Sequence, residues 1–148
     1  MNHVPNKTTV HAWWCLLRAN TTALSYVEKA LKKADLPPLA WYDVLFELQR
    51  VGRQGIRPYV LQRLLLLPQY GLSRLLARME TTGYLERRAC EGDGRGQFLF
   101  ITNSGQKMQR RMWPIYGKAI QHLVGEHLTE QETVTLSSLL HKIFEEKN

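Results

Sequence analysis

Apolar residues recur at three- and four-residue steps along most of this chain, which is the periodicity of amphipathic helices. In the first half of the chain the pattern predicts four successive helices, at about residues 8–34, 38–51, 58–66 and 68–82. Leu36-Pro37-Pro38 ends the first helix, because proline is tolerated in the first turn of a helix but clashes in its interior. Pro58 and Pro68 are expected to open the third and fourth helices for the same reason.

The fourth predicted helix, from Pro68 to Thr82, has the clearest pattern. Gly83 is the expected stop, since glycine readily adopts the left-handed conformation that follows many helices. Its apolar residues lie at i, i+3, i+4 and i+7, and they are Leu72, Leu75, Leu76 and Met79. This spacing places them on one face and predicts that this face is buried.

The periodicity changes after Gly83. Residues 84–89 and 97–102 are extended in character, and the three glycines between them predict a turn, so this region is expected to form a β-hairpin. Residues 103–128 return to a helical pattern, in which Pro114 is expected to introduce a kink. Thr129 and Glu132 match a capping box that opens a last helix.

A short helix, a tight turn, a second helix and a hairpin form the plan of a winged helix-turn-helix. We therefore expect a mainly α fold with a small β-hairpin wing in a single domain, residues 1–148. The winged helix-turn-helix core covers residues 38–103, and flanking helices cover residues 8–35 and 104–148.

Positive charge is concentrated in the middle of the chain. The protein has 148 residues and a formal net charge of +7, but residues 50–113 contain 12 basic and 4 acidic residues, and 11 of these bases are arginines. The rest of the chain is close to neutral. A dispersed excess would indicate only a solvated surface, whereas a concentrated one indicates a polyanionic partner, most simply nucleic acid.

The second helix of such a pair enters the major groove of DNA, and its exposed side chains contact base edges. Arginine and glutamine form paired hydrogen bonds with guanine and adenine. Arg95, among the hairpin glycines, suits the narrow minor groove, and Asp93 is positioned to hold its side chain. The predicted DNA-binding residues are Gln69, Tyr70, Ser73, Arg74, Arg78, Arg88 and Arg95. The alternative is a solvated polar face with a floppy exposed loop.

The stretch from Leu36 to Thr133 resembles the MarR family of bacterial regulators. The similar segments are Leu39-Ala40-Trp41-Tyr42-Asp43-Val44-Leu45, Leu72-Ser73-Arg74-Leu75-Leu76-Ala77-Arg78-Met79, Gly83-Tyr84-Leu85-Glu86-Arg87, Asp93-Gly94-Arg95 and Phe100-Ile101-Thr102-Asn103-Ser104-Gly105. The resemblance implies a homodimer, built from the N- and C-terminal helices, that binds a pseudo-palindromic operator. It also implies DNA contacts at Ser73, Arg74, Arg78 and Arg95.

Two positions depart from the family pattern. Many members have a second basic residue after the wing arginine, where this chain has Gly96, and this departure is expected to weaken minor-groove contact. Many have Ser or Thr at the start of the recognition helix, where this chain has Leu67-Pro68-Gln69, and this implies a different base preference.

The resemblance also implies regulation. Family members often release DNA, acting as repressors, when a small aromatic acid binds between the dimerisation helices and the winged domain, and others respond to oxidation of a cysteine in the first helix. The candidate pocket residues are His11, Trp14, Cys15, Arg18, Trp41 and Tyr42. The first four lie on one side of the first helix, with an aromatic wall and a cation for a carboxylate. Cys15 is the candidate redox sensor, and packing in a dimer interface remains an alternative for the whole set.

Several classes of function are not indicated. Cys15 and Cys90 do not form a disulfide framework, and no Cys or His spacing suits a metal site, so no metal or cofactor is expected. No nucleophile, base and orienting group converge, and His122 and His127 do not share a helical face, so an enzyme is not expected. No apolar run suits a membrane span and no signal peptide is recognised, so the cytoplasm is the default location. A winged-helix adaptor for protein partners is the rival class, and it would require an acidic or apolar recognition face.

Overall fold

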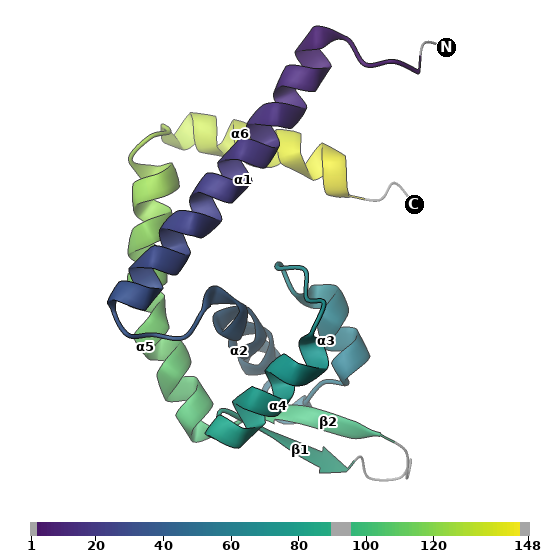
Figure 1. Ribbon diagram of the computed structural model, residues 1–148, viewed down its shortest axis with the longest axis vertical. Helices are drawn as coiled ribbons and strands as arrows, with labels where there is room; N and C mark the ends of the chain where they lie inside the picture. The colour runs from purple at the N-terminus through teal and green to yellow at the C-terminus, as the bar shows by residue number, and fades with distance from the viewer. Residues whose placement is uncertain (1–2, 90–95, 146–148) are drawn as a thin grey trace. The chain divides into compact units, whose positions relative to one another are not determined.

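The computed structural model describes residues 3–89 and 96–145 of the chain. The chain forms two compact units, and the first of them combines an N-terminal and a C-terminal segment (Figure 1). The first unit contains residues 1–30 and 116–148, and the second contains residues 31–115. The prediction of a mainly helical fold with one hairpin is confirmed.

In the first unit, polar side chains cap the N-terminal ends of two long helices. Helix α1 (Lys7–Lys33) begins after Asn6, whose Oδ1 accepts a hydrogen bond of 2.8 Å from the Thr9 N–H. Helix α6 (Glu130–Phe144) begins with the predicted capping box, in which Thr129 and Glu132 each accept a hydrogen bond from the other's backbone N–H. Local sequence therefore fixes where both helices start.

A π-helical segment joins the two C-terminal helices of the chain. Helix α5 (Asn103–Ile120) contains Pro114, and it passes into η2 (Gln121–Gly125) where a helix to residue 128 was predicted. The Glu126 N–H donates to the Gln121 carbonyl, five residues earlier, at 2.8 Å. His122 and His127, which were not expected to share a helical face, have their rings 5.7 Å apart at this wider turn.

The second unit contains the helix-turn-helix and most of the buried apolar residues. Its helices are α2 (Leu39–Val51), the short 3-10 turn η1 (Gly52–Gln54), α3 (Pro58–Leu64) and α4 (Leu72–Thr82). Gly83 ends α4 in the left-handed conformation, as predicted. The fully buried side chains of this unit include Val44, Leu45, Leu48, Leu61, Leu76, Met79, Leu85, Leu99 and Met112.

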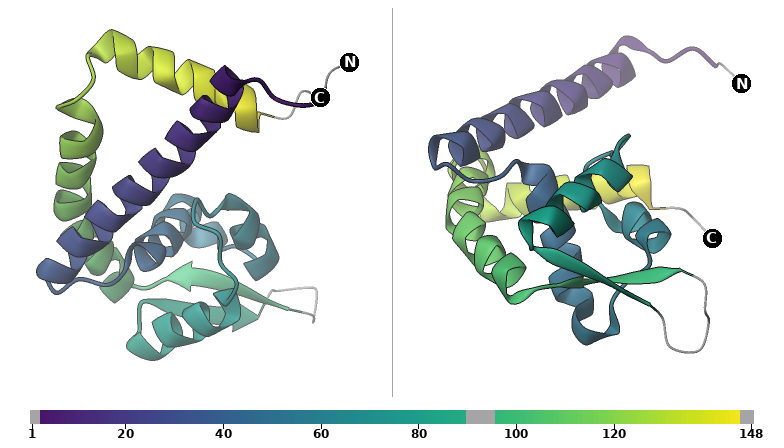
Figure 2. Two further views of the ribbon diagram at one scale, coloured as in Figure 1. Left: turned by 45° about the horizontal axis from the view of Figure 1, so that its top comes forward. Right: turned by 60° about the horizontal axis from the view of Figure 1, so that its bottom comes forward.

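The hairpin consists of β1 (Leu85–Ala89) and β2 (Gln97–Ile101), paired antiparallel from Leu85 opposite Ile101 to Ala89 opposite Gln97. Both views in Figure 2 show it alongside α4, and α4 contacts β1. Outside the two strands, the backbone of Ile56 forms an isolated antiparallel bridge with Leu99 of β2. The two residues exchange hydrogen bonds of 3.1 and 2.8 Å. This bridge could not be predicted from the sequence, because one isolated residue has no alternating pattern.

The start of the fourth helix differs from the prediction. Helix α4 begins at Leu72, and its first helical bond runs from the Leu75 N–H to the Gly71 carbonyl at 3.0 Å. Gln69 and Tyr70 therefore lie in the turn before the helix, not on its exposed face. Pro68 lies in the same turn, so it does not open the helix as predicted.

Candidate nucleic-acid interface

Helix α4 has one buried and one exposed face. Leu72, Leu75, Leu76 and Met79 are buried, as their spacing predicts. The residues between them on the other side are all exposed, and they are Ser73, Arg74, Ala77 and Arg78. Arg74 and Arg78 lie one turn apart, so their guanidinium groups project from the same side of the helix. The structure thus presents a polar, cationic helix face, and contact of this face with DNA remains a prediction.

The turn before α4 forms a shallow hollow beside that face. Its volume is about 420 Å³, and it is lined by Gln62, Gln69, Tyr70, Gly71, Leu72, Ser73 and Arg74. Gln69 is half-buried, whereas the Tyr70 side chain is fully exposed. Gln69 and Tyr70 therefore remain next to Ser73 and Arg74 although they lie outside the helix.

A buried carboxylate holds the turn between α3 and α4. Asp43, on α2, is only 7% exposed, and its Oδ2 accepts a hydrogen bond of 2.8 Å from the Leu67 N–H. Burial raises the pKa of Asp43, while hydrogen bonds from the backbone of Leu67 and Leu66 oppose the rise. This contact anchors the backbone of Leu67 in the turn, five residues before α4 begins.

Sequence reasoning did not identify the Asp43 contact. Asp43 stands within an apolar helical pattern, and its partner lies 24 residues further along the chain. The available signal in the sequence was a pair of acids, Asp43 and Glu47, one turn apart in a helix rich in apolar residues. Glu47 is also buried, and its carboxylate pairs with Arg50 at 2.8 Å.

The hairpin carries arginines on both of its faces. Nε of Arg87 lies 3.5 Å from Oε1 of Glu80, and this salt bridge links the hairpin to α4. Arg88, a predicted DNA contact, pairs with Glu86 at 2.8 Å and stacks 3.9 Å above the Phe100 ring. The predicted wing residues Arg95 and Asp93 lie outside the described residues, as does Cys90.

Four of the candidate effector residues cluster on α1 in the first unit. The His11 and Trp14 rings stack at 5.9 Å, and the Arg18 guanidinium lies 5.2 Å from the Trp14 ring centroid. The Cys15 sulfur is 3.5 Å from Nε2 of His11. All four residues are exposed.

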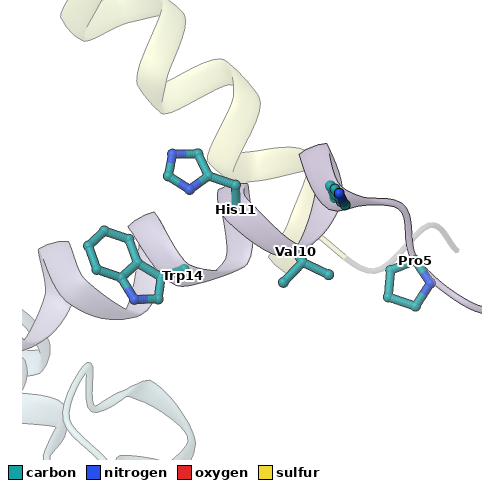
Figure 3. A pocket seen from close by; sticks show the side chains of 5 residues that line it. Pro5, Val10, His11 and Trp14 are labelled. Carbon is teal, nitrogen blue, oxygen red and sulfur yellow. The ribbon is translucent and has the colours of Figure 1, made fainter.

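A hollow lies at the start of the same helix. Figure 3 shows Val10, His11 and Trp14 of α1 around it, with Pro5 from the segment that precedes the helix. Lys7 completes the lining, and the volume is about 420 Å³. Two of the candidate effector residues, His11 and Trp14, therefore line a surface hollow within the first unit.

The other two candidates belong to the second unit, where both take part in packing. Trp41 meets Tyr84 edge-on, with ring centroids 5.8 Å apart. Tyr42 is buried and stacks with Phe46 and Trp113, each at 6.3 Å, and burial raises the pKa of its hydroxyl. Their role in an effector pocket remains a prediction.

Within residues 3–89 and 96–145, no group of three or more His, Cys, Asp or Glu side chains is arranged to hold a metal ion. In the same described ranges, no helix is both long and apolar enough to cross a membrane.

The geometry of α3, α4, β1 and β2 is that of a helix-turn-helix with a hairpin wing.

Comparison with known proteins gives the same fold. A MarR family regulator from Streptomyces coelicolor, solved in complex with DNA, covers 97% of this chain and 89% of its own at 24% identity, with a TM-score of 0.86. A mutant of MarR from Escherichia coli, solved with operator DNA, covers 93% and 96% of the two chains at 24% identity, with a TM-score of 0.81.

Sequence comparison points to the same group of proteins. Escherichia coli K12 has a multiple antibiotic resistance protein, MarR, that is 28% identical over 88 residues; the match covers 60% of this chain and 61% of that protein. The Streptomyces coelicolor protein is a transcriptional regulator. Residues 34–96, which include the whole helix-turn-helix, match the model of the MarR family. The chain is therefore similar to members of the MarR family in the sequence of residues 34–96 and in its fold.

Proposed function

We propose that this protein is a sequence-specific DNA-binding transcriptional regulator that reads the major groove with α4. The observation that carries the proposal is the exposed face of α4, where Ser73, Arg74 and Arg78 lie opposite a fully formed apolar face. Serine and arginine are base-reading residues, and arginine forms paired hydrogen bonds with guanine. Two relatives of the same fold were solved with DNA, which supports this assignment. A regulator of this kind acts in the cytoplasm.

The proposed DNA-binding form is a homodimer on a pseudo-palindromic operator. Among the described residues of the first unit, the buried apolar residues are Val27 and Ala119, and α6 contains no buried residue. Exposed apolar side chains line α1 and α6, and they include Val10, Trp13, Leu17, Val134, Leu136, Leu139, Ile143 and Phe144. Apolar surface of this extent indicates a protein interface. A second copy of the chain would cover it and would present two recognition helices to two half-sites.

Binding to a fluorescently labelled duplex that contains the protein's own promoter region tests the DNA assignment. We expect nanomolar affinity that falls steeply with salt, because phosphate contacts release counterions. Arg74→Ala should weaken binding by about 1–3 kcal/mol if the arginine contacts a base. Lys29→Ala, which removes an exposed charge from α1, is the control and should bind as the wild type does. Equal binding by Arg74→Ala and wild type would show that α4 does not read this DNA.

We further propose that the protein is a repressor that a small aromatic acid releases from DNA. The stacked Trp14 and Arg18 on α1 offer a flat apolar wall and a cation for a carboxylate. A phenolic acid such as 4-hydroxybenzoate is the probe, and operator release that Arg18→Ala abolishes is the expected result. Unchanged release by Arg18→Ala would contradict this role.

Redox regulation is the second candidate, because the exposed Cys15 sulfur lies 3.5 Å from the His11 ring. An exposed thiol is accessible to peroxide, which oxidises cysteine to a sulfenic acid. Peroxide should then release the wild-type protein from DNA but not Cys15→Ser. Release of both proteins by peroxide would exclude Cys15 as the sensor.

A further inference from the structure

Residues 65–71 connect α3 to α4 and are neither helix nor strand. Two predicted base-reading residues, Gln69 and Tyr70, belong to this connection rather than to α4. Among the described residues, no backbone N–H of residues 66–71 donates a hydrogen bond to a backbone carbonyl. Regular secondary structure therefore does not fix the conformation of this connection.

A buried carboxylate supplies the missing partner. Oδ2 of Asp43, a residue of α2 that is 7% exposed, accepts a hydrogen bond of 2.8 Å from the Leu67 N–H. The backbone of Leu66 is bonded to the same carboxylate. We propose that Asp43 is a positioning residue for DNA reading, and that its carboxylate holds Gln69 and Tyr70 in the conformation that fits the operator. This role rests on the proposed DNA-binding function and involves no contact between Asp43 and DNA.

Pro68 passes the constraint from the bonded backbone to the reading side chains. Its ring fixes its own φ and disfavours the helical region for the preceding residue, Leu67. Gln69 therefore follows the bonded N–H after a single, stiff residue. Gln69 is half-buried and lines the same hollow as Ser73 and Arg74, so its position beside α4 depends on the path of the connection.

The helix that carries Asp43 is a firm support. Val44, Leu45 and Leu48 of α2 are fully buried, so this helix belongs to the core of the second unit. Burial raises the pKa of Asp43, and the negative charge of Glu47, one turn along, adds to the rise. A charge that is buried at this cost is not explained by stability alone, and such groups can instead specify one conformation. Fixing the connection is therefore a role that suits Asp43.

The loss of the carboxylate should change operator recognition more than general attraction to DNA. A free connection must be ordered when its side chains bind bases, and ordering about one residue corresponds to about a tenfold loss of affinity. Contacts to phosphates carry no information on base sequence. Asp43→Ala should therefore lower affinity for the operator by about tenfold, and leave affinity for unrelated DNA and the dependence on salt unchanged.

Two labelled duplexes test this expectation, one from the protein's own promoter region and a shuffled duplex of the same length and base composition. The measured quantity is the ratio of the two affinities, because partial unfolding lowers both affinities by the same factor. Asp43→Ala should lower the ratio, whereas Asp43→Asn, which keeps an acceptor for the Leu67 N–H, should retain most of it. Glu47→Gln is the matched control, because Glu47 is also buried on α2 but pairs with Arg50, and its ratio should equal that of the wild type.

Removal of the reading side chains tests the route of the effect. In a protein that carries Gln69→Ala and Tyr70→Ala, Asp43→Ala should cause no further loss of the ratio, since the side chains that it positions are gone. Pro68→Gly loosens the same connection from an exposed position, and should lower the ratio while the buried carboxylate is kept. If thermal melting shows that Asp43→Ala is unfolded, Pro68→Gly decides the question, and a wild-type ratio in this variant overturns the proposal.

The outcomes separate this role from the proposed function. A wild type that binds both duplexes equally, or neither, overturns both. If the wild type prefers its promoter and Arg74→Ala weakens that binding, while Asp43→Ala and Pro68→Gly keep the wild-type ratio, only the positioning role is excluded. Equal losses on the two duplexes for Asp43→Ala would assign Asp43 a structural role and overturn the proposal. A further drop of the ratio in the variant that lacks the Gln69 and Tyr70 side chains would overturn it as well.

Discussion

The two compact units of this chain expose opposite kinds of surface. In the second unit, α4 and the hairpin bury their apolar residues and present arginines, such as Arg74, Arg78 and Arg88. In the first unit, α6 buries nothing, and its exposed side chains include Leu139, at 53% exposure, and Phe144, at 64%. The comparison indicates two different partners, a polyanion for the second unit and an apolar surface for the first.

The difference also indicates how stability is distributed. The second unit has a continuous core around Leu45, Leu76 and Leu99, whereas the buried apolar residues described in the first unit are Val27 and Ala119. A helix with few buried contacts gains stability mainly when a partner covers it. We therefore expect the first unit to depend on assembly and the second to depend on its own interior.

The largest effect should come from charge placed on the apolar face of α6. Leu139→Glu would bury an unpaired carboxylate in the proposed dimer, which costs several kcal/mol. We expect a shift from dimer to monomer at micromolar concentration and a loss of DNA affinity of about a hundredfold, since two linked half-site contacts become one. Sedimentation and duplex titration measure the two changes.

Ser138→Glu is the matched control for that experiment. Ser138 is exposed on the same helix and lies on the side away from the stripe of Leu136, Leu139 and Ile143. The variant should remain dimeric. A monomeric wild type, or a Leu139→Glu protein that is still fully dimeric, would exclude this face as the interface.

An intermediate effect is expected from the buried carboxylate of the second unit. Asp43→Ala should lower the free energy of unfolding by about 1–3 kcal/mol, because the Leu67 N–H loses its partner. Asp43→Asn keeps an acceptor in the same place and should be much less affected. Urea titration of both variants makes the comparison, and equal losses would show that the hydrogen bond is not the cause.

The same residue predicts a dependence on pH. Burial raises the pKa of Asp43, so the ionised carboxylate is the costly form in the folded protein. This group favours folding below its unfolded pKa, and the benefit is lost as the pH rises through its folded pKa. The stability of the wild type relative to Asp43→Asn should therefore increase as the pH falls from 7 toward 4. A difference that stays constant over this range would contradict the assignment.

The smallest effect should arise at the start of α6 in the first unit. Thr129→Ala removes the acceptor for the Glu132 N–H and should cost about 1 kcal/mol. Thr135→Ala on the same helix is the control, because its hydroxyl only donates back to the Gln131 carbonyl and its loss should be within about 0.5 kcal/mol. Thermal melting at a fixed protein concentration compares them, and equal losses would assign the capping box no role.

The sequence predicted well wherever the deciding contacts are local. The buried face of α4 follows from the spacing of Leu72, Leu75, Leu76 and Met79. The α6 start follows from Thr129 and Glu132, three residues apart. Both features depend on residues within one or two helical turns, so the spacing of residues in the sequence is enough to predict them.

The predictions failed where a distant residue or an unusual backbone turn decides. The buried hydrogen bond of the turn joins Asp43 to Leu67, 24 residues further along the chain, and the contact of His122 with His127 lies at a π-helical turn. The positions of prolines and the spacing of hydrophobic residues predict neither of these two contacts, because both patterns reflect only the preferences of neighbouring residues.

The sequence by itself therefore determined the helical type of these elements, the buried side of α4, the presence of a hairpin and the arginine-rich middle segment. Only the tertiary structure decided that Ile56 pairs with Leu99, and so that Arg57 lies over Phe98 beside the base of the wing. The physical reason is that backbone hydrogen bonds between distant segments, and the close approach of Gly55 to Phe100, are set by packing of the folded chain rather than by local periodicity.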